Sequence, residues 1–193
     1  MFSTLRQAFK EGDMHLMDSV QKMDDQVDIL HDEILEYLSD IRQEPLTDHQ
    51  SEVFRTLMGA AINLENLADV IETELVAIGK AFIDQQEKPT EAATMILLED
   101  FADKVGQAIA DVIKAVSESS EKAAENVIAV KDEIRRISDE FLTQQSESMG
   151  MKEADSLQLI RLQMELLDKL RQIYTLAKRV AKDFVPLEVA SKA

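Results

Sequence analysis

The sequence predicts an all-α protein built from long packed helices. Apolar residues make up 45% and charged residues 31% of its 193 positions, and it holds only five Gly and three Pro. An all-β chain needs far more turn-forming residues than this. Apolar side chains recur at helical spacing almost throughout, and no alternating strand pattern competes with them. Because the connections between the helices are short, neighbouring helices should pack antiparallel as a bundle.

Three helices are predicted in the first half of the chain. Gly12 ends the first helix, and Asp13 begins the second. Pro45 interrupts the second helix, and Thr47 followed by Gln50 matches a capping box, which marks the start of the third. The predicted ranges are 2–10, 13–41 and 47–86.

Three further helices are predicted in the second half. Pro89 and Thr90 stop the preceding helix and cap the next one. The segment SESSE, residues 117–121, separates this helix from one that extends to about residue 145. Gly150 precedes the last helix. The predicted ranges are 91–116, 121–145 and 152–183.

An internal repeat organises these helices. MDDQVDILHDEIL (23–35) aligns with VKDEIRRISDEFL (130–142), and LENLADVI (64–71) aligns with LDKLRQIY (167–174) in the same order. The chain therefore contains tandem three-helix bundles, predicted at 1–88 and 89–193. The first bundle has a truncated first helix, because the short helix at the N-terminus stands where the second unit has a full one.

Charge and composition exclude several classes of function. The net charge is −17 and the pI is about 4.5. Such a surface repels phosphate backbones and anionic lipid, so we expect no nucleic-acid binding. The absence of cysteine excludes disulfides and thiolate metal sites and suits a cytoplasmic location. No apolar run is long enough to span a membrane, so we expect no membrane insertion of this chain.

Two pairs of carboxylates form a candidate metal site in the first unit. Asp24 and Asp28 are spaced i,i+4 on one helix, and Glu65 and Asp69 share that spacing on the next. Each pair projects from one helical face. If the helices are neighbours, four carboxylates can converge on one cation, a divalent or ferric ion such as Fe, Zn, Mn or Mg. His31 lies one turn beyond Asp28 and could add a nitrogen ligand.

Chance is the competing explanation for these pairs. The chain has 38 acidic residues, and most charged runs are simply solvated faces. The second unit carries Lys131 and Arg135, then Asp168 and Gln172, at the matching positions. Two basic side chains repel a cation, so a second metal site is not expected there. Arg135 could instead pair with Asp168.

These residues resemble the PhoU domain. The resemblance rests on DDQVDILHDEILEYLSDI, a short loop containing proline, and INLENLADVIE. It implies two three-helix repeats with E(D)-x-x-x-D motifs, regulation of phosphate uptake without catalysis, and metal binding in some members. The first motif pair falls on Asp24 with Asp28 and on Glu65 with Asp69. The second pair departs from the motif at Lys131, Arg135 and Gln172.

YLSDI followed by LENLAD is most similar to the cytoplasmic C-terminal region of bacterial sodium/phosphate cotransporters. This similarity implies a membrane phosphate transporter as partner and a location at the inner face of the membrane. In such transporters the first PhoU helix directly follows the membrane spans. The start MFSTLRQAFKEGD therefore leads us to expect an excised soluble portion of a transporter, or a gene model without its upstream membrane domain. The alternative interpretation is that the protein is a stand-alone regulator of phosphate transport rather than part of a transporter.

No enzyme pattern is present. Ferritin-like di-iron bundles need Glu-x-x-His pairs, and none of His15, His31 and His49 has Glu three positions earlier. There is no Ser/His/Asp constellation, glycine-rich dinucleotide loop or P-loop. The alternative function is a metal-free helical scaffold that forms a homo-oligomer or docks a partner through the apolar strip beside the truncated helix.

Overall fold

A computed structural model describes the chain except residues 44, 85–91, 150–153, 187–189 and 191–193. Every regular element within the described residues is helical, which confirms the all-α prediction. None of the described helices is long and apolar enough to cross a membrane.

The first unit contains α1 (Phe2–Glu11), α2 (Met14–Arg42) and one long composite helix. The predicted helix ends at Gly12, Asp13 and Thr47 are confirmed, whereas the predicted end near residue 86 lies outside the described residues. Gly12 ends α1 in the left-handed conformation at φ 66°, which glycine adopts without steric cost. The Asp13 carboxylate accepts from the first backbone amides of α2, and Thr47 and Gln50 form a complete capping box. The composite helix comprises α3 (Asp48–Asp69), the π-helix η1 (Val70–Leu75) and α4 (Val76–Asp84).

The second unit contains α5 (Ala92–Glu118), α6 (Glu121–Ala129), α7 (Lys131–Met149) and α8 (Ala154–Lys182). The SESSE break is confirmed, since Ser120 caps α6. The predicted single helix over 121–145 is wrong, because it is interrupted at Val130. The carbonyl of Val127, beside the break, accepts a hydrogen bond of 3.1 Å from the Tyr174 hydroxyl of α8. This bond gives the Val127 carbonyl a hydrogen-bond partner at the break, where the regular backbone hydrogen bonds of the helix are interrupted.

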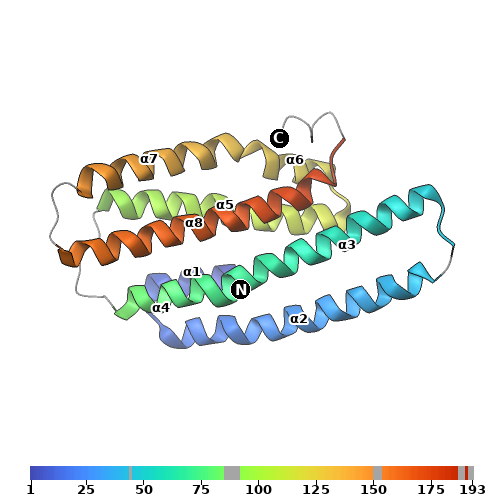
Figure 1. Cartoon of the computed structure of the whole chain (residues 1–193), viewed down its shortest axis with the longest axis horizontal. Helices are drawn as coiled ribbons and strands as arrows, with labels where there is room; N and C mark the ends of the chain where they lie inside the picture. Colours follow the sequence, from blue (N-terminus) through green and yellow to red (C-terminus); the bar gives the residue numbers. More distant parts are fainter. Residues whose placement is uncertain (44, 85–91, 150–153, 187–189, 191–193) are drawn as a thin grey trace.

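The two units pack together around one core. α3 lies against α8, and α5 packs on α6, α7 and α8 (Figure 1). Leu75 of the first unit and Phe101 and Ile173 of the second are fully buried in the same hydrophobic cluster. The predicted boundary after residue 88 lies outside the described residues, so the division into 1–88 and 89–193 stays a prediction.

The first helix is short, as predicted. α1 has 10 residues and its counterpart α5 has 27. α1 packs on α2, η1 and α4, and Phe2, Leu5 and Ala8 bury its inner face. It thereby covers one half of α2 and leaves the other half, towards the α2–α3 connection, beyond its reach (Figure 1).

Candidate metal centre

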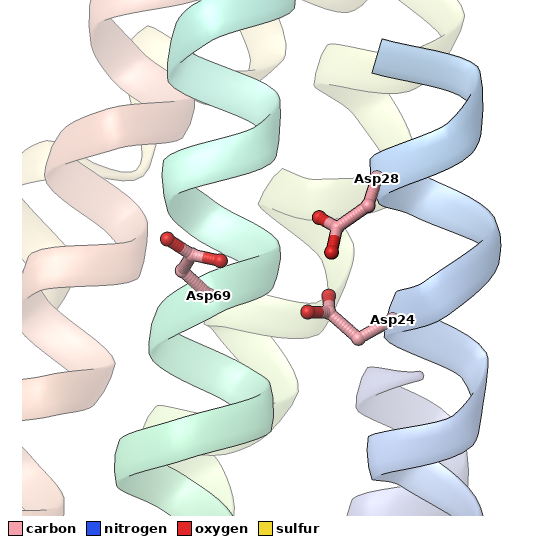
Figure 2. A group of neighbouring side chains, drawn as sticks. All are labelled: Asp24, Asp28 and Asp69. Atoms are coloured by element: carbon pink, nitrogen blue, oxygen red, sulfur yellow. The ribbon is translucent and has the colours of Figure 1, made fainter. Parts of the chain in front are cut away.

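Three carboxylates meet at the seam between α2 and α3. Asp24, Asp28 and Asp69 each offer a carboxylate oxygen within 4.8 Å of the other two. Asp24 and Asp28 project from α2 towards α3, where Asp69 lies (Figure 2). The structure thus brings together three of the four acids expected from the sequence.

Asp24 is the buried member of this group, with 8% of its surface exposed. Its Oδ1 atom is buried and has no hydrogen-bond partner. Burial raises the pKa of Asp24 to about 6, and repulsion from Asp28 and Asp69 adds to the effect. The oxygens of a buried carboxylate normally have hydrogen-bond partners. A cation beside Asp24 would therefore stabilise its ionised form.

The helix geometry changes directly after Asp69. Asp69 is the last residue of α3, and the π-helix η1 begins directly after it. A π segment inserts extra residues per turn, and such insertions are frequent at functional sites. Within this segment Ile71 and Leu75 are buried in the core, and Asp69 at its start lies beside Asp24 and Asp28 of α2.

Glu65 and His31 lie at the edge of the group. Burial raises the pKa of Glu65, and the neighbouring Asp69 raises it further, while His31 acts in the opposite direction. Glu65 is outside the three-carboxylate group. The Nε2 atom of His31 is buried without a hydrogen-bond partner. Both residues therefore border the seam without belonging to its centre.

A polar network next to the seam was not predicted from the sequence. Gln21 donates to Glu72 at 3.0 Å and accepts from Lys80 at 3.0 Å, and Lys80 also pairs with Asp18 at 2.8 Å. Hydrogen bonds from Thr73 and Gln21 lower the pKa of Glu72. Glu72 thus has its own hydrogen-bond partners, and its charge adds to the effects that raise the pKa of Asp24. The position of Gln21, three residues before Asp24, is a sequence signal that points to this network.

The second unit lacks an equivalent acidic group among the described residues. Arg135 does not pair with Asp168 and instead pairs with Asp139, one turn along its own helix, at 3.8 Å. Asp168 and Gln172, which match Glu65 and Asp69, line an open surface pocket together with Arg171. Arg171 repels positive charge, so this pocket is unsuited to binding a cation.

The donor set of the first unit fits a hard metal ion. Carboxylate oxygens suit Mg, Mn and iron, and Zn accepts them together with imidazole nitrogen. The Oδ1 atom of Asp24 and the Nε2 atom of His31 both lack a hydrogen-bond partner, and both are atoms that can coordinate a metal. A bound cation would also offset the repulsion among three carboxylates in one seam.

Comparisons with known proteins agree on the fold. A family model for the PhoU domain matches residues 1–73. The crystal structure of PhoU from Pseudomonas aeruginosa superimposes with a TM-score of 0.85 and 15% sequence identity, covering 100% of this chain and 89% of that chain. No curated protein matches the chain. Residues 1–73 thus match the PhoU domain, and the chain as a whole has the fold of PhoU.

Proposed function

We propose that the protein is a non-catalytic regulator of phosphate uptake that acts on a membrane phosphate transporter. The PhoU-domain match and the PhoU fold support this assignment. The chain carries no recognisable enzyme motif. The protein would therefore transmit the signal through changes in helix packing rather than through a chemical reaction. The strongly acidic surface argues against phosphate itself as the ligand.

The carboxylate seam supports a metal-dependent form of this function. Asp24, Asp28 and Asp69 would hold a divalent or ferric ion, with Glu65 and His31 at its border. The carrying observation is the buried, unpartnered oxygen of Asp24 within a group of three acids. The ion would supply positive charge that ties α2 to α3 and so fixes the packing of the first unit.

The transporter partner follows from the resemblance to the C-terminal region of sodium/phosphate cotransporters. YLSDI in α2 and LENLAD in α3 carry that resemblance. It supports a location in the cytoplasm at the inner face of the membrane, where the protein would act on membrane helices of the transporter.

Phosphate uptake in cells tests the proposal. A strain lacking the coding sequence would receive the wild type, the Asp24→Asn/Asp28→Asn/Asp69→Asn variant, or no replacement. Uptake of radiolabelled phosphate would be measured after growth in high and in low phosphate. We expect the ratio of the two uptake rates to differ from the wild-type ratio in the strain without the protein. In the variant the ratio should differ in the same direction. An unchanged ratio without the protein would refute the regulatory function.

A metal-free interaction module is the second candidate. The exposed apolar side chains on α2 and α3 favour it, because such patches mark binding surfaces. It would form a homo-oligomer or dock a partner. In the uptake experiment, this candidate predicts that loss of the protein changes the ratio while the triple carboxylate variant behaves as the wild type.

A further inference from the structure

A basic surface on α8 interrupts the otherwise acidic surface of the chain. Five of the 21 Lys and Arg residues fall within residues 169–182, and this segment contains no Asp or Glu, although the chain has 38 of them. Lys169 pairs with Glu74 of η1 at 3.0 Å. The other four form a surface that we call the basic ridge: Arg171, Lys178, Arg179 and Lys182.

Helical spacing places the basic ridge on one face of α8. Residues 171, 178 and 182 are spaced i, i+7 and i+11, so they lie within about 40° of one another around the helix and extend over about 16 Å. Ile173 and Ala177, on the opposite side of the helix, are fully buried in the core. The ridge therefore faces away from the core, and Arg171 and Arg179 are exposed.

No carboxylate neutralises the basic ridge. Within the part of the chain that the structure describes, no ion pair joins any of its four side chains to Asp or Glu. The basic residues that precede it on α8 are both paired, Arg161 with Glu165 at 2.8 Å and Lys169 with Glu74. The ridge is thus a run of uncompensated positive charge in a protein of net charge −17.

A further cation from α7 adds to this charge. Lys178 lies over the ring of Tyr174, with its Nζ 5.7 Å from the ring centre. Burial lowers the pKa of Lys178, and the neighbouring Lys131 and Lys182 lower it further. Lys131 is the first residue of α7. Repulsion among these three ammonium groups would be relieved by an anionic partner.

An open pocket beside the ridge suits a carboxylate. It is lined by Arg171 and Arg179 together with Asp168, Gln172, Thr175 and Leu176. Each guanidinium can donate two parallel hydrogen bonds to one carboxylate. Among the described residues, Asp168 forms no ion pair with either arginine. Both guanidinium groups can therefore receive carboxylates from another molecule.

An anionic membrane fits the basic ridge less well than an acidic protein segment does. Within residues 169–182 no large apolar side chain is exposed, so the ridge offers nothing to insert among lipid chains. A bilayer is also much wider than the ridge, and the acidic residues around the ridge would be repelled by it.

The chain itself is also a less suitable source of the acidic partner. A second copy brings its own net charge of −17, whereas a short acidic segment brings only a few carboxylates to the ridge. The segments of this sequence outside the described residues are 44, 85–91, 150–153, 187–189 and 191–193, and none of them carries more than one net negative charge.

We propose that the basic ridge binds an acidic helical segment of a partner protein. The carboxylates of that segment repeat at intervals of three and four residues, which gives them the same spacing along a helix as the basic side chains of α8. The interaction is independent of the candidate metal centre, because the ridge lies on α8 and the three carboxylates lie on α2 and α3.

A designed peptide tests this proposal. The probe is a fluorescent alanine-rich peptide with Glu at i, i+4, i+7, i+11 and i+14, which places its carboxylates on one helical face. The same peptide with Gln in place of Glu is the control. Fluorescence anisotropy with the full chain should show saturable binding of the Glu peptide that weakens as salt increases. The Gln peptide should bind at least tenfold more weakly.

Variants locate the binding surface. Arg171→Gln/Arg179→Gln should weaken binding of the Glu peptide at least tenfold. Arg135→Gln/Arg136→Gln is the matched control, because it removes two positive charges from exposed positions of the neighbouring helix α7. It should bind the peptide within about twofold of the wild type. Circular dichroism would confirm that both variants remain folded.

Four results would overturn the proposal. The first is absence of saturable binding of the Glu peptide to the wild type. The second is equal affinity of the two folded double variants. The third is binding to vesicles containing phosphatidylglycerol, lost in the ridge variant, without binding to the peptide, which would assign the ridge to a membrane. The fourth is self-association in sedimentation velocity that the ridge variant abolishes, which would assign the ridge to a second copy of the chain.

Discussion

Replacement of Asp24 by Asn should stabilise the metal-free protein. Asp24 is buried, its Oδ1 has no partner, and Asp28 and Asp69 lie beside it. The ionised carboxylate is therefore unfavourable in the folded state when no cation is present. Asn keeps nearly the same shape and removes the charge, so the variant should unfold at a higher temperature after treatment with a chelator.

The pKa shift of Asp24 gives the magnitude and the sign of its effect on the free energy of unfolding. Asp24 shifts from 3.8 to about 6 on folding, and each unit corresponds to about 1.36 kcal/mol, so the ionised group costs at most about 3 kcal/mol. Water reaches the exposed Asp28 and Asp69, which reduces the expected value to about 1–2 kcal/mol. Because the folded pKa lies above the unfolded one, the favourable contribution of Asp24 is complete below about pH 4 and is lost as the pH rises through about 6.

Thermal unfolding in the presence of a chelator measures this effect. At pH 7 the Asp24→Asn variant should gain about 2–8 °C over the wild type, at about 2–4 °C per kcal/mol for a chain of this size. Between pH 7 and pH 5 that advantage should shrink by up to about half, because Asp24 binds a proton in the folded wild type over this range. Asp25→Asn, at the adjacent exposed position, is the control and should show neither change. A lower unfolding temperature for Asp24→Asn, or an advantage independent of pH, would refute the reasoning.

Three further changes test the fold, each by chemical denaturation. Thr47→Ala removes the capping box of α3 and should cost about 0.5–2 kcal/mol; no loss would mean that the cap does not stabilise this helix. Tyr174→Phe leaves the buried Val127 carbonyl unpaired and should cost about 1–3 kcal/mol, whereas an unchanged midpoint would show that water replaces the hydroxyl. Leu75→Ala opens a cavity in the shared core and should cost about 2–5 kcal/mol in one cooperative transition. Two separate transitions would instead indicate that the units unfold independently.

Helix ends and the α2 carboxylate pair could be predicted because local spacing determines them. Gly12 and the Thr47–Gln50 box act on backbone groups within one turn. Asp24 and Asp28 share a face of α2 because they are one turn apart in a regular helix.

Features that depend on distant residues were not predicted. The break at Val130 is accompanied by a bond from Tyr174 to Val127, 47 positions away in the chain. The π-helix changes the helical periodicity directly after Asp69, and Glu72 within it accepts a hydrogen bond from Gln21, 51 positions away in the chain. β-branched residues within η1, such as Val70 and Ile71, indicate a weaker preference for regular α-helix, but they do not specify where the extra residues enter.

Metal content tests the central claim of a metal centre between α2 and α3. The protein would be purified without an affinity tag or chelator, loaded separately with Mn, Fe, Zn and Mg, freed of unbound metal, and analysed by mass spectrometry. The Asp24→Asn/Asp69→Asn variant would be treated in the same way, with its fold checked by circular dichroism. We predict about one tightly bound ion per wild-type chain and none in the folded variant. Absence of metal from the wild type after every loading, or equal metal in the two proteins, would contradict the account.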